Sequence, residues 1–226
     1  MFLERMAIAG LGAFAMCATM LLRDRQYPEV ALWKKVVLTG LLTATSVVGA
    51  LLLSFVESGA FGGASFYGAI FLTPILIFAA KLMKVTKLDL LNLCAPASCA
   101  MLVIMQFDCL YNGCCFGKYL PNLEFQFPSQ AAEMVVGVGI MVILMRMHTK
   151  NHQAQLYPWY MILYGVCRTV LQCFRYGGTK PWLLGLSHGH IWSLISVTVG
   201  VIWLVRSRAQ KPVVKKTVTK KKKKKA

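Results

Sequence analysis

The chain has 226 residues, of which 57% are hydrophobic and only 15% are charged. A soluble domain of this size carries more charge, so the composition excludes the soluble globular class and indicates an integral membrane protein. The net charge of +17 also occurs in nucleic-acid-binding proteins, but eleven of the 25 lysines and arginines follow Val205. The clustered lysines and arginines therefore indicate a solvated tail, not a nucleic-acid partner.

Seven hydrophobic segments approach the roughly 20 apolar residues that a helix needs to cross a bilayer. We therefore predict an all-α polytopic membrane protein, with a seven-helix membrane domain at 1–205 and a basic, disordered cytoplasmic tail at 206–226. The expected helices cover residues 6–22, 36–56, 65–83, 88–107, 129–146, 157–174 and 189–205. Pro74 and Pro96 predict kinks in the third and fourth helices.

The distribution of basic residues predicts how the helices are oriented. On the seven-helix reading, twenty of the 25 bases fall in the 1–2, 3–4 and 5–6 connections and the tail. By the positive-inside rule, the N-terminus is outside and the C-terminus is in the cytoplasm. No small-residue cleavage site follows the first segment, so we expect it to be a retained helix and not a signal peptide.

The three connections expected on the exterior are polar or rich in glycine. They are Glu57–Gly68, Phe107–Gln130 and Arg175–His190, and the second is the longest polar interruption of the chain. The cytoplasmic connections are short and basic, which suggests a role in orientation only. We therefore expect any functional site to lie on the outer face.

The sixth predicted helix carries a polar stripe. Tyr164, Arg168, Gln172 and Arg175 are spaced so that they fall on one helical face. An arginine inside a membrane span costs at least about 2.5 kcal/mol and faces a cavity or a partner. Arginine binds phosphate oxygens in pairs, so Arg168 predicts either a lipid-headgroup site or a structural pairing with an acid. Arg175 could instead extend to the headgroup region.

Three acids lie near the expected outer boundary: Glu57, Asp108 and Glu133. Glu133 falls in the first turn of the fifth predicted helix, where a carboxylate compensates the helix dipole. A site role is the alternative.

Cys109, Cys114 and Cys115 lie within seven positions of the polar connection. Four readings stay open. In the first, cysteines of this group form a disulfide, since the connection is exterior. In the second they bind a metal ion together with His188 or His190, and in the third one of them is a nucleophile with such a histidine as its base. In the fourth they are small residues that line a pocket. The other five cysteines lie in apolar segments and are expected to be packing residues.

Five motifs in chain order resemble a known family. They are GGASFYG, LYNGCCFG, FPSQAAE, YGVCRTVLQCFR and GLSHGHIWSL, spread over roughly residues 57–200. They are similar to the patterns GGMSFHGG, GRxGNFxNxExxG, HPSQLYE, YGxxRFxxEFFR and GxSMGQxLS of prolipoprotein diacylglyceryl transferases. That family moves diacylglycerol from phosphatidylglycerol to the lipobox cysteine of a lipoprotein precursor. It releases glycerol phosphate at the outer face of the bacterial cytoplasmic membrane.

The resemblance implies roles for individual residues and requires no cofactor or metal. Arg168 and Arg175 would hold the phosphate, and Asn112 and Tyr67 would shape the glycerol site. Tyr67 or one of two histidines would assist thiol deprotonation. The expected catalytic residues are Arg168, Tyr67, His190 and His188. The expected substrate-binding residues are Asn112, Gly113, Tyr164, Arg175, Gly63, Ser65, Gln130 and Glu133.

Several family positions hold a different residue in this chain. These departures are Tyr67 for histidine, Gln106 for arginine, Cys109 for asparagine, Cys114 and Gln172 for glutamate, and His190 for glutamine. They support two alternatives to catalysis. One is a non-catalytic phospholipid-binding membrane protein on the same scaffold, and the other is an exterior-facing thiol redox protein that uses the three clustered cysteines.

Overall fold

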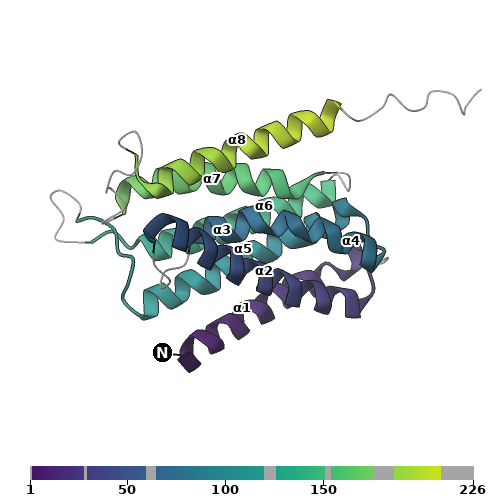
Figure 1. The fold of residues 1–226 in the computed structure, drawn as a ribbon, viewed down its shortest axis with the longest axis horizontal. Coiled ribbons are helices and arrows are strands. Elements are labelled where there is room, and N and C mark those ends of the chain that lie inside the picture. Colours follow the sequence, from purple (N-terminus) through teal and green to yellow (C-terminus); the bar gives the residue numbers. More distant parts are fainter. Residues whose placement is uncertain are drawn as a thin grey trace, which may run out of the picture.

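The computed structural model describes residues 2–27, 30–59, 65–119, 126–150, 154–175 and 186–209. These residues form a helical bundle without named strands (Figure 1). Its elements are α1 Phe2–Leu22, η1 Asp24–Gln26, α2 Leu32–Ser58, α3 Phe66–Leu72, η2 Thr73–Leu76, α4 Ile77–Met83, α5 Lys87–Tyr111, α6 Ser129–Lys150, α7 Leu156–Phe174 and α8 His188–Ala209. Since α3, η2 and α4 form one span, Phe66–Met83, seven helical segments are present, which confirms the predicted fold class.

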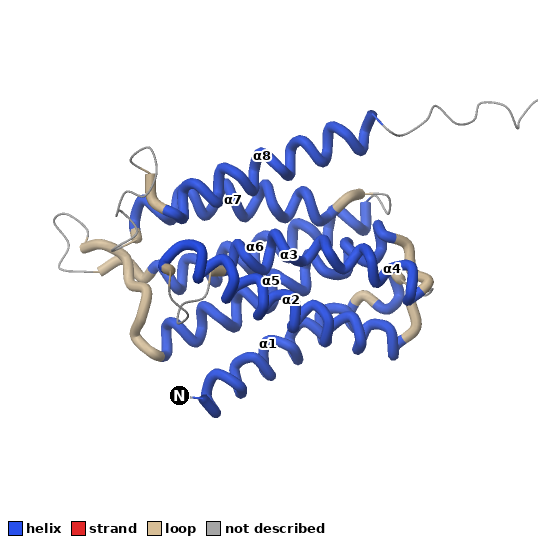
Figure 2. The backbone as a smooth tube through the Cα atoms, viewed as in Figure 1, coloured by secondary structure: helices blue, strands red, loops and turns tan. Residues whose placement is uncertain are grey.

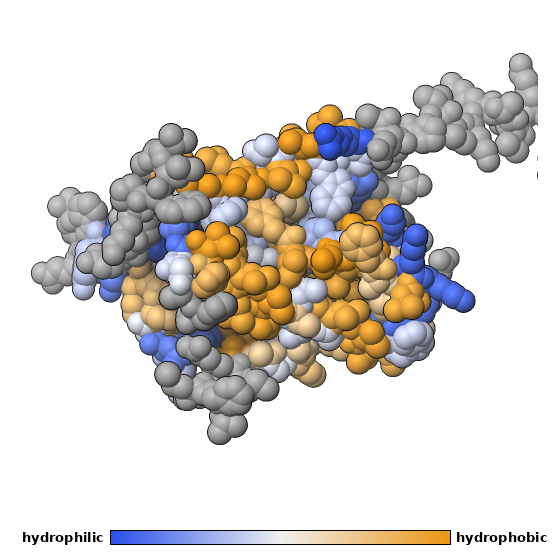
Figure 3. All heavy atoms as spheres, in the orientation of Figure 1, coloured by the Kyte–Doolittle hydropathy of each residue, from blue (hydrophilic) through white to orange (hydrophobic). Residues whose placement is uncertain are grey.

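The helices have the length and composition of membrane spans. Five of those described are long and apolar enough to cross a bilayer, and α1 adds a shorter apolar stretch, Ala7–Leu22. On the face shown in Figure 3, hydrophobic side chains cover the middle of the bundle and hydrophilic residues gather toward its two ends. Together with the five long apolar helices, this apolar surface indicates lipid as the surrounding medium. The protein is therefore a multi-pass membrane protein.

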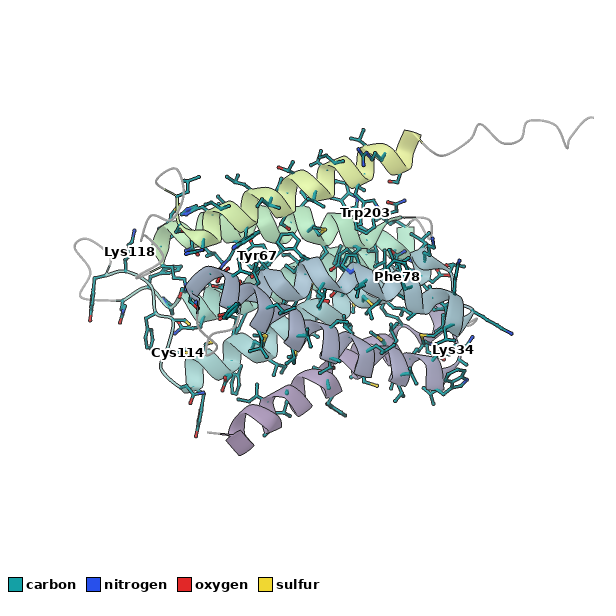
Figure 4. The ribbon with its side chains drawn as sticks, in the orientation of Figure 1. Lys34, Tyr67, Phe78, Cys114, Lys118 and Trp203 are labelled. Carbon is teal, nitrogen blue, oxygen red and sulfur yellow. The ribbon has the colours of Figure 1, made fainter. Side chains whose placement is uncertain are left out.

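The two ends of the bundle differ in their contents. α5 ends, and α6 and α8 begin, at the same end of the molecule (Figure 2). We call it the cysteine end, because it carries Cys114 and the nearby Lys118, whereas Lys34 lies at the opposite end (Figure 4). α1 begins at the cysteine end and α8 finishes at the other. This placement agrees with an odd number of crossings.

The helix α5 is the centre of the bundle. In the most apolar 18-residue stretch of α5, 72% of the residues are buried inside the protein, whereas 17% are buried in the corresponding stretch of α8. It packs against α1, α6 and α7. Its middle is rich in alanine, serine and cysteine, and such small side chains let membrane helices approach closely. Pro74 is the second residue of the 3-10 turn Thr73–Leu76, which interrupts the third span where a kink was predicted. Pro96 lies buried within α5, which continues through it as one α-helix.

The helix α5 continues four residues beyond its predicted end at residue 107. It stops at Tyr111 because Gly113 adopts a left-handed conformation, with φ of +63°. The Gly113 N–H donates to the Leu110 carbonyl at 3.3 Å and the Cys114 N–H to the Cys109 carbonyl at 3.0 Å. These are the two bonds of a Schellman cap. The polar connection is therefore shorter than predicted, and Cys109 belongs to the helix.

At the opposite end, charges that were expected to mark orientation alone are built into the fold. Arg23 is 2% exposed, and its guanidinium donates to the Asn92 carbonyl at 2.7 Å and to the Tyr27 hydroxyl at 3.0 Å. Lys35 is buried and paired with Asp24. The expectation that these connections serve only orientation is therefore wrong for Arg23 and Lys35, which tie helices together. The predicted tail at 206–226 lies, beyond Ala209, outside the described residues.

Two glycines bring α2 and α3 into backbone contact. A methyl group on Gly68 would collide with the Gly49 carbonyl, and one on Gly49 would collide with the Gly68 carbonyl. The neighbouring atoms are backbone, so they cannot turn away. Gly68, one of the motif glycines, therefore has a structural role, because it sets the distance between the two helices.

Replacing Gly68 with alanine should lower the free energy of unfolding by about 1–3 kcal/mol, because overpacking forces the helices apart. Thermal unfolding in detergent will show this as a lower midpoint. Gly40→Ala is the matched control, since Gly40 lies in α2, as Gly49 does, but has nothing within 4 Å of an added methyl group. Equal midpoints for the two variants would contradict the proposed contact.

Candidate functional site

A buried carboxylate joins three helices. Glu133, near the start of α6, is 3% exposed. Arg168 of α7 forms an ion pair with its Oε1 atom, and Nη1 of Arg175 lies 3.3 Å from the same oxygen. Gln106 of α5 donates a 2.6 Å hydrogen bond to the other oxygen, Oε2. We call these four residues the Glu133 cluster.

The Glu133 cluster carries more positive than negative charge. Two guanidinium groups, from Arg168 and Arg175, face one carboxylate, which gives a formal charge of +1. The arginine side chains are only 12% and 20% exposed, so water compensates them poorly. The pairing of Arg168 with an acid, which was the alternative to a lipid-headgroup site, is observed, but it does not neutralise both arginines. The remaining charge suits a monoanion, and guanidinium groups match the oxygens of a phosphate.

The local conformation explains how these charges meet. Tyr164 and Gln172 are buried and Arg168 is largely so, which confirms the polar stripe along α7. Arg175 lies just past the end of α7 in an extended conformation, with φ of −81° and ψ of 133°. It reaches Glu133 from the connection and not from the helical face. The Lys118 N–H donates to the Phe174 carbonyl at 2.7 Å and holds this connection beside the one before α6.

Two buried amide oxygens near the cysteine end have no hydrogen-bond partner among the described residues. They are Oε1 of Gln106 and Oε1 of Gln130. The other end of each amide is occupied, since Gln106 donates to Glu133 and Gln130 donates to the Cys114 carbonyl. An unpaired buried acceptor costs about 1–3 kcal/mol. The two oxygens are therefore suited to receive hydroxyl or N–H donors from a bound molecule.

Tyr67, which takes the place of the family's histidine, lies inside the bundle near the cysteine end (Figure 4). It is 4% exposed, and its hydroxyl lies 2.6 Å from Oγ of Ser193 in α8. Because Ser193 donates its own hydrogen to the Gly189 carbonyl, Tyr67 must be the donor of this bond. Its ring packs 5.5 Å from that of Tyr164. In this arrangement Tyr67 is a hydrogen-bond donor.

His190 belongs to a second polar group, which joins the end of α7 to the start of α8. Its Nδ1 atom lies 2.9 Å from Oγ of Ser187, and its Nε2 atom lies 3.8 Å from Sγ of Cys173. Gln172 donates to the same Ser187 hydroxyl at 3.2 Å. His190 therefore has a cysteine and a serine as neighbours at the cysteine end. His188 is the first residue of α8 and is partly exposed.

Asn112 and Gly113 form the cap of α5. The exposed Asn112 side chain donates to the Asp108 carboxylate at 2.6 Å. The side chains of Asp108 and Asn112 line an open cavity of about 380 Å³ between α1 and α5. The rest of its lining is apolar or aromatic: Ala7, Ile8, Leu11, Ile104, Phe107 and Tyr111. An acyl chain has the chemistry that this cavity would accept.

Ser65 and Gly63 come from the first motif. Ser65 donates to the Glu57 carboxylate at 2.8 Å, and its N–H donates to the Ala50 carbonyl at 3.1 Å. Both contacts tie the start of α3 to the second half of α2. Ser65 therefore has an evident structural role, and Gly63 lies outside the described residues.

The three clustered cysteines converge at the cysteine end, and Cys114 is visible there in Figure 4. The sulfur atoms of Cys109, Cys114 and Cys115 all lie within 4.8 Å of one another. The helix cap explains this, because it folds Cys114 back over the last turn of α5, which carries Cys109. All eight cysteines are free thiols. Cys173 was expected to be a packing residue, but it is exposed and faces His190.

The surroundings shift the pKa values of two cysteines in opposite directions. A hydrogen bond from Cys109, together with the charge of Arg175, lowers the pKa of the Cys115 thiol. Loss of solvation raises the pKa of Cys114. A lower pKa leaves more reactive thiolate at a pH below neutrality.

After treatment with EDTA, Cys115 should react with iodoacetamide at pH 6.5 about tenfold faster than Cys114, because more of it is ionised. Tandem mass spectrometry of the peptide containing both cysteines will locate the label. Unfolding the protein should abolish the difference, because both shifts depend on the folded surroundings. Preferential labelling of Cys114 in the folded protein would contradict the assignment.

Sequence reasoning missed several partners within the site. Gln106 was noted only as a departure from the family pattern, yet it donates to Glu133. Ser193 and Ser187 were not singled out, although they hold Tyr67 and His190. Their position in the last motif was the available signal. Ser187 lies 3 residues from His190, but Ser193 lies 126 residues from Tyr67. Spacing along the chain could therefore not reveal the pairing of Ser193 with Tyr67.

Comparison with known proteins agrees with this arrangement of motifs. Residues 6–206 match the family described as prolipoprotein diacylglyceryl transferase, and the match covers most of the chain. No curated protein matches the chain. The matched region contains the Glu133 cluster and all seven helical segments apart from the first residues of α1 and the last residues of α8. The chain therefore belongs to the prolipoprotein diacylglyceryl transferase family, a transferase family of lipoprotein biosynthesis.

Proposed function

We propose that this protein transfers a diacylglyceryl group from phosphatidylglycerol to the lipobox cysteine of a lipoprotein precursor. The observation that supports it most is the Glu133 cluster, with its formal charge of +1 near one end of a membrane bundle. Phosphatidylglycerol carries one negative charge on its phosphate, so its headgroup would neutralise the cluster. Its glycerol hydroxyls could donate to the unpaired oxygens of Gln106 and Gln130.

The proposed reaction requires a thiol to lose its proton and a phosphate to leave. The thiolate attacks the glyceryl carbon that carries the phosphate, a C–S bond forms, and the C–O bond breaks. Glycerol phosphate leaves with the electron pair of that bond. Arg168 and Arg175 would stabilise the charge that develops on its oxygens, which is where electrostatic catalysis has its largest effect.

The proposed orientation follows the positive-inside rule, and it puts the cysteine end on the outer face of the bacterial cytoplasmic membrane. A lipoprotein precursor would meet the donor lipid there. The apolar cavity between α1 and α5 is lined in part by Asp108 and Asn112 and is suited to an acyl chain. Asn112 would then lie at the lipid headgroup.

A transfer assay tests the proposal. Purified protein is mixed with phosphatidylglycerol and a lipobox peptide, and the peptide mass is measured. We expect a diacylglyceryl increment on the cysteine peptide and none on a cysteine-to-alanine peptide. Bound phosphatidylglycerol without any increment, in folded protein, would instead identify a non-catalytic lipid-binding protein.

The base of the reaction is proposed to be Tyr67 or a histidine, His188 or His190. Tyr67→His, which restores the residue of the family's pattern, should raise the transfer rate near neutral pH by at least about tenfold. A histidine is a better general base than a tyrosine at that pH. Tyr67→Phe is the matched variant, and we expect it to slow transfer. An unchanged rate in both variants would exclude a role for position 67.

A further inference from the structure

We propose that Cys109, Cys114 and Cys115 form a binding site for a single thiophilic metal ion, Zn²⁺ or Cu⁺. The site goes beyond the proposed transfer reaction and does not depend on it. Its three sulfur atoms already lie within 4.8 Å of one another.

The distances suit metal ligation better than a disulfide. With Zn–S bonds of about 2.3 Å, two sulfurs of a tetrahedral site lie about 3.8 Å apart. Small side-chain rotations bring sulfurs that are within 4.8 Å to this separation. A disulfide requires a sulfur–sulfur distance of about 2.0 Å and joins only two of the three cysteines. A metal ion uses all three.

The donor atoms select the kind of ion. Among the described residues, the group contains three cysteine sulfurs and no imidazole or carboxylate. Thiolates favour Zn²⁺ and Cu⁺, whereas oxygen ligands favour Mg²⁺ and Ca²⁺. Three thiolates around Zn²⁺ carry a net charge of −1. The guanidinium of Arg175 interacts with one of these thiols, that of Cys115.

The backbone that carries two of the ligands is held in place. Ser129 donates to the Cys115 carbonyl and Gln130 donates to the Cys114 carbonyl, and both donor residues are buried at the start of α6. The Schellman cap fixes Cys114 over Cys109. Ligands that are positioned before binding lose little entropy when the ion arrives.

Cys115 adopts a conformation that its side chain disfavours. Its φ of +64° lies in the left-handed region, which glycine enters freely and cysteine does not. Such a conformation is typical of a functional position where surrounding contacts enforce it. The chain therefore keeps a thiol at a position where glycine would fold with less strain.

The test titrates the full-length protein, purified in detergent and stripped with a chelator, with Zn²⁺ and separately with Cu⁺ without oxygen. We expect one equivalent of at least one ion to bind with a Kd below about 1 µM. Cys114→Ser should weaken binding by at least about 100-fold. The matched control is Cys167→Ser, which removes a thiol far along the chain from the site and should leave binding unchanged.

Cys115→Gly separates ligand loss from misfolding, because glycine accepts a φ of +64° without strain. This variant should be at least as stable as the original protein and yet lose the ion. Unchanged binding in Cys115→Gly, or no binding of either ion by the unaltered protein, would overturn the proposal. So would a count of six free thiols in protein unfolded without reductant, because it would reveal a disulfide among the eight cysteines.

Discussion

Glu133→Gln will lower the free energy of unfolding by about 3–5 kcal/mol and abolish transfer. The variant removes the carboxylate that pairs with both Arg168 and Arg175. Removing one partner of a buried ion pair leaves an uncompensated charge, which accounts for a cost of this size. Here two guanidinium groups lose their partner at once. Thermal or denaturant unfolding in detergent measures the stability, and the lipobox peptide mass measures the transfer.

The double variant Gln106→Glu with Glu133→Gln provides the control. Gln106 and Glu133 face each other at 2.6 Å, so the exchange moves the carboxylate from α6 to α5 and keeps the net charge. We expect it to recover most of the lost stability. A double variant that is as unstable as Glu133→Gln would show that the loss comes from local packing and not from charge.

Arg168→Ala will reduce transfer by about a thousandfold and cost less stability than Glu133→Gln. Loss of one preorganised charge or donor at a developing anion typically reduces the rate by 10²–10³. Glu133 keeps Arg175 and Gln106 as partners, so its carboxylate stays paired in this variant. We expect a loss of about 1–3 kcal/mol, the usual cost of a broken buried hydrogen bond.

Arg206→Ala is the matched control for Arg168→Ala. Arg206 is an exposed arginine of α8 and belongs to none of the clusters described above. Its replacement should change neither transfer nor stability. If Arg168→Ala transfers at the rate of Arg206→Ala, the phosphate does not bind at the Glu133 cluster.

Much of the fold could be predicted from the sequence, because membrane helices are specified by length and hydrophobicity. All seven predicted segments occur, and the 3-10 turn at Pro74 falls where a break was expected. The predicted end of α5 fell four residues early because Asp108 was assigned to the polar connection, although the helix continues to Tyr111. The signal that ends the helix is Gly113, whose left-handed conformation closes the cap.

The candidate site could be predicted only in part. The spacing of Tyr164, Arg168 and Gln172 correctly indicated one buried stripe, since helical periodicity links these residues. The pairing of Arg168 with Glu133 joins residues 35 positions apart, on α7 and α6. Packing of the bundle decides such a contact. For the same reason, the sequence left the dipole and site roles of Glu133 open.

The cysteines show where a local signal was available but ambiguous. Their spacing allowed a disulfide, a metal site, a nucleophile or a pocket lining. The convergence of Cys109 and Cys114 follows from the cap at Gly113, which is local. The contact of Cys115 with Arg175 depends on where the end of α7 lies, which is not local. The sequence therefore identified the three cysteines without their arrangement.

The most direct test of the central claim measures which phospholipid the Glu133 cluster binds. Native mass spectrometry will compare retention of phosphatidylglycerol and of zwitterionic phosphatidylethanolamine by the original protein, Arg168→Ala and Arg206→Ala. We predict preferential retention of phosphatidylglycerol by the original protein and by Arg206→Ala, and loss of that preference in Arg168→Ala, because the excess positive charge is then gone. Equal retention of both lipids by the original protein, or an unchanged preference in Arg168→Ala, would contradict a phosphate site at this cluster.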